Sequence, residues 1–256
     1  TPDASGWRSS ERYAHVADMT ASDVAWEWLR RNESYDRDFQ ALSDNESELG
    51  ALTDRIGQRW GCDFPVDPMQ APPEARVIWL PQEDTSAIVL AAPPDIPSAS
   101  ADPQPTIDAA IGVDAGGETH LVFDLGNGQR VALVRPSATR PAKPLGAFIP
   151  LGLEGFDRLE SVARLLAALH GRAIPPDTRV TRQQRARLCR MLQAFDGHRA
   201  GATQQEIAQV VFRIGSLGRD DWQASSARHA TKALLRDARA MIVGGYRALL
   251  RHRRQF

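Results

Sequence analysis

The chain of 256 residues contains only two cysteines, Cys62 and Cys189, and neither has a close His or Cys neighbour. A disulfide framework or a zinc cluster is therefore not supported, and we expect no cofactor. No stretch approaches the roughly eighteen consecutive apolar residues of a membrane span, so we expect no membrane partner. The first residues lack the apolar core of a secretory signal, and together these absences predict a cytoplasmic protein.

Catalytic motifs are also missing. The glycines of "GVDAGGETH", near Gly112, do not have the spacing of a nucleotide-binding loop, and a turn is the simpler interpretation. The six histidines are scattered without metal-ligand spacing, and no serine lies in a G-x-S-x-G elbow. We therefore expect that the protein is not an enzyme.

Charge is divided unevenly along the chain. Residues 1–154 carry 12 Lys and Arg against 24 Asp and Glu, a net charge of −12, whereas residues 155–256 carry 19 against 8, a net charge of +11. This asymmetry indicates a polyanionic partner for the basic end. The alternative is that the two halves neutralise each other across an interface.

The patterns predict a mainly α protein with a small β-containing middle region. Residues 1–68 form a helical module, in which Val24 and Trp28 mark an apolar stripe with Arg30 and Arg31 on the other side. Another helix runs from about residue 46 to residue 60, and Gly61 ends it.

Residues 69–145 are Pro-rich and contain short β-branched runs at 76–80 and 86–92, which predict strands. Asn127-Gly128 lies between two further apolar runs, a pattern typical of a β-hairpin.

Residues 146–256 are predicted to form a trihelical, helix-turn-helix-like domain. Its leading helix is expected to face the core with one apolar stripe: Phe156, Leu159, Ala163, Leu166 and Leu169. T-x-x-Q from Thr181 and T-x-x-E from Thr203 are capping boxes that begin the next two helices.

The final helix carries a basic stripe. At about 100° per residue, four cations fall within a narrow arc about opposite the apolar side chains. These four are Arg228, Lys232, Arg236 and Arg239, and Asp237 is expected to lie outside the arc. A helix packed by one face and offering aligned cations on the other is suited to a DNA duplex. An ordinary solvated face, which usually mixes both signs, is the alternative.

Roles follow from position along this helix and the preceding one. Ser225, Ser226, Arg228 and His229 lie near the helix start, where such motifs reach base edges. Lys232, Arg236 and Arg239 are expected to meet phosphates, and Gln204 and Gln205 to clamp a phosphate at the start of the preceding helix.

The turn is longer than the three or four residues of a standard helix-turn-helix. We expect "RIGSLGRDDW" to hold an extra half-turn, in which Asp220 or Asp221 caps the last helix and Trp222 packs in the core.

Two stretches resemble known families. "ATQQEIAQVVF…DDWQASSARHATKALLRDARAMIVGGYRALL" is similar to the DNA-binding domain of RovC-like transcription factors, which are named after an activator of type VI secretion genes and have relatives on bacterial mobile elements. "DVAWEWLRRNESYDRDF" with "RWGCDFPVDP" resembles the transcriptional-regulator-like domain often fused ahead of it. The resemblance implies a bacterial, sequence-specific regulator of double-stranded DNA that is oligomeric.

The resulting hypothesis is a transcriptional regulator, most simply an activator, that reads promoter DNA through the final helix. Its N-terminal module would bind a second copy, RNA polymerase or another regulator, so deletion of residues 1–60 should spare DNA binding. The alternative is a protein-interaction module or anti-activator that sequesters a partner regulator without binding DNA.

Overall fold

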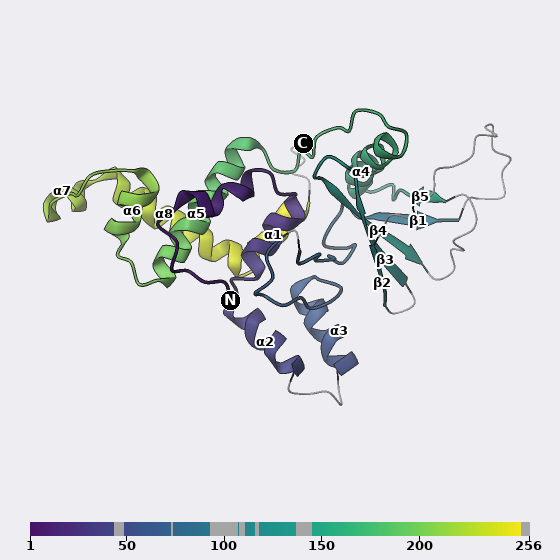
Figure 1. The fold of residues 1–256 in the computed structure, drawn as a ribbon, viewed down its shortest axis with the longest axis horizontal. Coiled ribbons are helices and arrows are strands. Elements are labelled where there is room, and N and C mark those ends of the chain that lie inside the picture. Colours follow the sequence, from purple (N-terminus) through teal and green to yellow (C-terminus); the bar gives the residue numbers. More distant parts are fainter. Residues whose placement is uncertain are drawn as a thin grey trace. The chain divides into compact units, whose positions relative to one another are not determined.

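The computed structural model describes residues 1–43, 49–72, 74–92, 107, 111–115, 118–136 and 145–251. It divides into two compact units, each built from distant parts of the chain (Figure 1). The first unit comprises Thr1–Leu52, Val66–Ala75 and Val180–Leu249, and the second comprises Thr53–Pro65, Arg76–Arg179 and Leu250–Phe256. The boundaries at 1–68, 69–145 and 146–256 are consecutive and remain a prediction about sequence modules. The element order confirms a mainly α chain with a small β middle region.

The N-terminal part of the first unit consists of η1 (Ser10–Ala17), α1 (Ala21–Leu29) and α2 (Glu33–Ser43). Trp26 and Trp28 of α1 are both fully buried, so this helix is enclosed on more than one side. The prediction that Arg30 and Arg31 face away from the core is wrong, because both are buried as well. Protein groups replace water around them, as the Arg30 bond to the carbonyl oxygen of Gln70 illustrates.

The C-terminal part of the first unit contains α5 (Arg182–Arg199), α6 (Gln204–Phe212), α7 (Arg219–Ala224) and α8 (Ser226–Ile242), followed by η3 (Gly245–Leu250). Helix α5 packs against η1 and α8, and α6 packs against both α5 and α8. Both predicted capping boxes are present, at Thr181 with Gln184 and at Thr203 with Glu206. Helices α5, α6 and α8 thus pack on one another, whereas α4, the leading helix of the predicted domain at 146–256, belongs to the second unit, so that domain stays a prediction.

The second unit contains α3 (Leu49–Trp60) from Thr53 onward, a five-stranded sheet and α4 (Glu154–Leu169). Its strands are β1 (Ile88–Ala91), β2 (Ile111–Ala115), β3 (Glu118–Asp124), β4 (Arg130–Pro136) and β5 (Gly146–Phe148). They are ordered β2-β3-β4-β1-β5, and only the β1–β4 pair is parallel. Gly61 ends α3 with a φ of 80°, as predicted.

The predicted hairpin is confirmed as β3–β4. Gly126 and Gly128 in its turn have φ values of 83° and 79°, a conformation that glycine adopts without strain. The carboxylate of Asp124 and the amide oxygen of Asn127 accept backbone N–H bonds within the turn.

The run at residues 76–80 is not a strand. It forms one isolated bridge, Cys62 with Trp79, supported by backbone bonds from Asp63 to Ile78 and from Leu80 to Gly61. Ile78 and Trp79 are buried nonetheless. The run is apolar because its side chains are buried. It does not form a strand because the described backbone pairs with it at one bridge only.

Helix α4 is turned opposite to the prediction. Leu165 lies in the core of the sheet, with Val162 and Leu169 packed beside it. The predicted core face is instead exposed: Phe156, Leu159 and Leu166 retain 54%, 50% and 49% of their exposure. Only Leu169 of that predicted stripe packs on the core.

Buried polar bonds fix this orientation of α4. Arg158 donates to the carbonyl oxygen of Ala87, and the Asp157 carboxylate accepts from the hydroxyl of Thr85. These polar side chains would lose their partners if the helix rotated, at a cost of about 1–3 kcal/mol for each buried group left unsatisfied.

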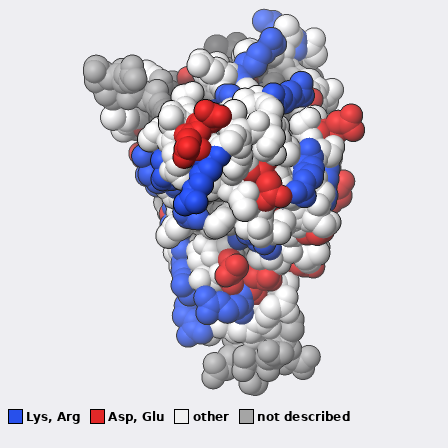
Figure 2. Space-filling model, turned by 90° about the vertical axis from the view of Figure 1, so that its left-hand side faces the viewer, with Lys and Arg blue, Asp and Glu red and all other residues white. Residues whose placement is uncertain are grey.

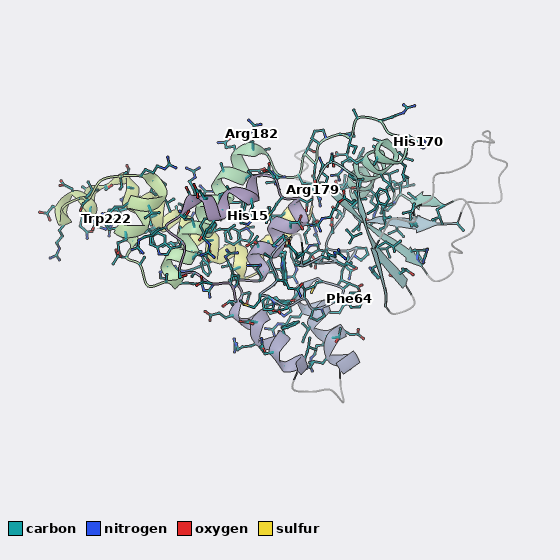
Figure 3. All side chains as sticks on the ribbon, in the orientation of Figure 1. His15, Phe64, His170, Arg179, Arg182 and Trp222 are labelled. Atoms are coloured by element: carbon teal, nitrogen blue, oxygen red, sulfur yellow. The ribbon has the colours of Figure 1, made fainter. Side chains whose placement is uncertain are left out.

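A second ionic cluster holds the end of α4. Asp177 lies 2.7 Å from Arg179 and 3.3 Å from Arg164, and Arg179 lies 3.1 Å from Asp84 (Figure 3 labels Arg179). Burial by itself would raise the pKa of Asp177, but Arg179 and Arg164 outweigh it and hold that pKa well below its usual range. Asp177 is therefore ionised and paired at neutral pH.

Candidate nucleic-acid interface

Helix α8 is packed by one face and exposed on the other. Its fully buried residues form the arc that the sequence predicts as apolar: Thr231, Leu234, Leu235, Ala238 and Ile242. Lys232, Arg236 and Arg239 are exposed, and the Arg236 side chain retains 77% of its exposure. The amphipathic spacing explains the division, because residues three and four apart share one face of a helix.

The start of α8 holds the four residues predicted to approach base edges. Ser225 is the N-cap, and its hydroxyl oxygen accepts from the N–H of Ala227 at 3.0 Å. Ser226 and His229 are exposed, whereas Arg228 is half-buried and donates to the carbonyl oxygen of Gln223. Ser225 thus has a structural task, and Ser226 and His229 are the most exposed of the group.

The segment between α6 and α8 is longer than a half-turn. It contains α7, a separate helix of six residues, in which Trp222 is buried as predicted (Figure 3). Asp220 and Asp221 lie in the first turn of α7 and do not cap α8, since Ser225 does so. The prediction of an aspartate cap is therefore wrong, because the chain begins a new helix before it reaches α8.

The two predicted glutamines of α6 lie in different surroundings. Gln204 is exposed at the first position of the helix. Gln205 is half-buried, and its side-chain amide donates to the carbonyl oxygen of Leu217 at 2.7 Å. Gln205 therefore ties α6 to the segment before α7.

The acid at position 237 forms ion pairs with two arginines of the basic surface. Asp237 pairs with Arg236 at 2.8 Å and also with Arg187 of α5. Burial opposes its ionisation, but the two arginines outweigh this and lower the pKa of Asp237. Helical spacing still puts Asp237 outside the arc of the cations, but its half-buried carboxylate lies within reach of both guanidinium groups.

Helix α5 contributes cations that the sequence interpretation missed. Arg187 retains 49% of its side-chain exposure, and Arg190, one turn further, is also exposed. At the other end of α5, His198 lies 2.8 Å from Arg239 of α8. The i, i+3 spacing of Arg187 and Arg190 was a usable signal, but only the packing of α5 on α8 shows that the two basic faces adjoin.

The surface that results mixes both signs. Figure 2 shows Lys and Arg side chains on the end of the molecule that carries α6 and α7, with acidic side chains between them. Arg8 and Glu206, 3.4 Å apart, form one exposed pair of this kind. Within the described part of the chain, Lys232 takes part in no ion pair, which leaves its charge available to a ligand.

A buried ionic network holds α5 against α1. Two nitrogens of the Arg31 guanidinium, Nε and Nη2, donate to Asp196 at 2.9 Å, and Arg31 also bonds to Glu27. The hydroxyl of Tyr13 donates to the same Asp196 carboxylate at 2.9 Å. Bidentate pairing satisfies the charges that burial has removed from water.

The network strongly favours ionised Glu27. Burial would raise the pKa of Glu27, but bonds and charges from His15, Arg31 and Arg30 outweigh it and lower the pKa to about 2. Next to Arg31, Asn32 joins α1 to the end of α8, since its amide nitrogen donates to the carbonyl oxygen of Ile242 at 2.8 Å. The two basic helices are thus positioned by residues of the N-terminal segment.

The comparisons with known families agree with this architecture. Residues 148–251 match the family model of the T6SS transcription factor DNA-binding domain, and residues 6–65 match that of the proteobacterial transcriptional regulator-like domain. A search of curated proteins finds no match.

These domains define the class as that of a transcription factor with its own DNA-binding domain. More narrowly, residues 148–251 are similar to the RovC-type DNA-binding domain and residues 6–65 to the regulator-like domain, so the predicted resemblance is confirmed. Neither match coincides with a compact unit, because residues 148–251 include α4 as well as the trihelical set.

Other classes of site find little support. Both matched families are regulator domains and not enzyme families. Among the residues that the structure describes, no three His, Cys, Asp or Glu side chains are grouped as a metal ion would need. No described helix combines the length and apolar character needed to cross a bilayer.

Proposed function

We propose that the protein binds promoter DNA through the exposed face of α8, assisted by the adjoining face of α5. The observation that carries the proposal is the exposed series Lys232, Arg236 and Arg239, on a helix whose opposite side is buried in a trihelical core. Such a helix can enter a major groove without giving up its packing.

The cations are proposed to meet phosphates. Lys232 forms no ion pair with a residue that the structure describes, and the Arg236 side chain retains 77% of its exposure. Arg187 and Arg190 of α5 extend the same surface and would follow the backbone beside the groove. Each phosphate that a cation neutralises releases condensed counterions, which makes the affinity salt-dependent.

Base reading is proposed for the start of α8, where Ser226, Arg228 and His229 lie. Arg228 would exchange its bond to the carbonyl oxygen of Gln223 for a base edge. Gln204, exposed at the start of α6, and the remaining donor capacity of Gln205 and Ser225 would contact the backbone.

An activator role is proposed from the N-terminal resemblance. The region at residues 6–65 that matches the transcriptional regulator-like domain would contact RNA polymerase or another regulator. The protein would act at promoters of type VI secretion genes, including promoters carried on mobile elements. A bacterial protein that binds promoters works where the DNA is, and we therefore propose a cytoplasmic location.

The test begins with selection of bound duplexes from random DNA at two salt concentrations, followed by fluorescence anisotropy on the recovered sequence. Lys232→Ala should weaken binding of recovered and random duplexes alike and reduce the slope of log affinity against log salt by about one. Arg228→Ala should cost about 1–3 kcal/mol on the recovered sequence only.

Arg37→Ala is the matched control, since Arg37 is an exposed arginine of α2 in the same unit. It should leave the affinity and the salt slope unchanged. A wild-type chain that recovers no duplex, or a Lys232→Ala chain with an unaltered slope, would favour the protein-interaction alternative.

A further inference from the structure

A single carboxylate at the edge of the exposed face of α8 joins this helix to α5. Asp237 Oδ1 accepts from Nε of Arg236 at 2.9 Å, and Nη2 of Arg236 lies 2.8 Å from the same oxygen. Asp237 Oδ2 accepts from Nη2 of Arg187. Each oxygen therefore serves a different arginine, and the two arginines belong to different helices. We call Arg187, Arg236 and Asp237 the triad.

The contact between Arg236 and Asp237 is not one that helical spacing produces by itself. Consecutive residues diverge by about 100° around a helix, so these two side chains leave α8 in different directions. Arg236 must turn along the helix surface to reach the carboxylate. A single exposed ion pair restrains a side chain little, but a carboxylate shared by two arginines forms a network. The network therefore restrains two side chains that would otherwise sample many rotamers.

The triad carries one net positive charge at neutral pH. Burial opposes ionisation of Asp237, but the hydrogen bonds and charges of Arg236 and Arg187 outweigh it and lower the pKa of the carboxyl group. Two guanidinium charges thus face one carboxylate. A guanidinium has five N–H donors, so both arginines keep donors for a further anion. The triad can accept a phosphate without giving up its internal bonds.

We propose that Asp237 is a positioning residue that determines how sharply the protein discriminates its own DNA sequence from other sequences. The inference rests on the proposed function, in which Arg187 and Arg236 meet phosphates beside the groove. Phosphate contacts carry no sequence information, but they fix the register and orientation of a helix in the groove. Asp237 holds both guanidinium groups at one point, so that they accept a phosphate in one register of α8. The start of α8 then meets one set of base pairs.

The same carboxylate has the opposite effect on DNA of arbitrary sequence. Non-specific affinity depends on how many phosphates the protein neutralises, whatever their register. Asp237 cancels one of the charges that the surface offers, and it therefore weakens non-specific binding. Ordering of the specific complex and weakening of the non-specific one both raise the ratio of the two affinities, which is the quantity that decides where a regulator binds in a genome.

A direct contact of Asp237 with a base would also affect discrimination. A carboxylate can accept from the amino group of cytosine in the major groove. The Asp237 side chain is only 29% exposed, however, and each of its oxygens already accepts from an arginine. The geometry favours action through the two arginines, and a double-mutant cycle separates the two mechanisms.

The test compares the affinities of the full chain for the recovered duplex and for random DNA, by fluorescence anisotropy between about 50 and 200 mM salt. Asp237→Asn keeps the shape of the side chain and removes its charge. Affinity for random DNA should rise about 8-fold at about 0.1 M salt, with a slope against log salt steeper by about one, because one more phosphate is neutralised. Affinity for the recovered duplex should change by less than about 2-fold, because two mobile arginines must then be ordered on binding. The ratio of the two affinities should therefore fall at least about 4-fold.

Asp3→Asn is the matched control, because it removes the same charge from the same unit. Asp3 is exposed, pairs with Arg12 at 3.7 Å and takes no part in the triad. Its slope and affinity ratio should equal those of the wild type, and Asp237→Glu, which restores the charge, should keep the wild-type slope. An Asp237→Asn chain with the wild-type ratio would overturn the inference and leave the proposed function standing. A wild-type chain that binds both duplexes equally would overturn both.

The double-mutant cycle uses Arg187→Gln. In that background Asp237 no longer joins two helices, so Asp237→Asn should lower the affinity ratio by a much smaller factor than it does in the wild type. An equal factor in both backgrounds would indicate a direct contact with a base and would overturn the positioning role. Because the buried face of α8 is untouched, each variant should melt within about 3 °C of the wild type. If Asp237→Asn melts lower, Arg187→Gln alone decides the matter, since an unchanged ratio in that variant also overturns the inference.

Discussion

Removal of the Arg31 side chain should destabilise the first unit, although Arg31 is not on the basic surface of α8. Arg31→Ala deprives Asp196 of two hydrogen bonds of 2.9 Å and removes the partner nearest to Glu27. Asp196 keeps only the Tyr13 hydroxyl among these contacts, and Glu27 keeps Arg30 at 3.7 Å and His15 at 3.8 Å. Two buried carboxylates thus remain with fewer hydrogen bonds and more distant positive charges.

The magnitude follows from the burial of the group. Arg31 and Asp196 expose 6% and 2% of their surface, so water cannot replace the lost partner. Breaking a buried pair by removing one side costs about 3–5 kcal/mol. Because a whole domain is stable by only about 5–15 kcal/mol, this cost removes a large share of the stability of the first unit.

Urea unfolding measured by tryptophan fluorescence and circular dichroism checks the value. Four of the tryptophans, Trp7, Trp26, Trp28 and Trp222, report on the first unit, and its transition should move to lower urea while the second unit is unaffected. DNA affinity should fall in proportion to the unfolded fraction and recover at low temperature.

A double-mutant cycle tests the reasoning itself. Arg31→Met with Asp196→Leu should cost less than the two single changes together, by about 0.5–3 kcal/mol, because the pair is removed instead of split. Arg37→Ala, an exposed change, should stay within about 0.5 kcal/mol of wild type. A cost below about 1 kcal/mol for Arg31→Ala, or strict additivity in the cycle, would refute the role given to the network.

Two further predictions concern the same unit. The pKa of Glu27 is lowered from 4.5 to about 2, so its contribution of about 3 kcal/mol to the free energy of unfolding is complete above pH 4.5 and disappears as the pH falls toward 2. Glu27→Gln should therefore flatten the dependence of stability on pH between these values. An unchanged curve in acid denaturation would contradict this prediction. Deletion of residues 1–60 should abolish DNA binding, because α5 loses Arg31 and α8 loses Asn32 as a partner and both helices unfold. A fragment of residues 61–256 that melts cooperatively and binds DNA would contradict this prediction.

The deletion expectation reverses the one drawn from the sequence. The sequence favours a separate module at residues 1–68, because the composition there is acidic and the motifs belong to another family. The structure places Thr1–Leu52 in the same compact unit as Val180–Leu249. Consecutive patterns identify helices well, but they do not show which distant helices share a core.

The motif W-E-W-L-R-R-N, residues 26–32, illustrates this limit. Its amphipathic spacing assigns the two arginines to the solvent side. In the fold all seven residues are buried, and Arg31 and Asn32 bond to α5 and α8. Local amphipathicity cannot anticipate a charge whose partner lies 165 residues away.

Local signals were sufficient where the physics is local. The capping boxes at Thr181 and Thr203, the hairpin at Asn127-Gly128 and the end of α3 at Gly61 depend on bonds or dihedral angles within a few residues. The same holds for the two faces of α8, since helical spacing alone separates its buried residues from its exposed cations.

Tertiary structure alone decided which faces meet. Helix α4 has an apolar stripe that the sequence assigns to the core, yet the buried bonds of Asp157 and Arg158 turn that stripe outward. Similarly, the packing of α5 on α8 brings Arg187 to Asp237 and adds a second basic helix to the surface. Hydrophobic spacing specifies that a helix has two sides, whereas the partners available to its buried polar groups determine which side faces the solvent.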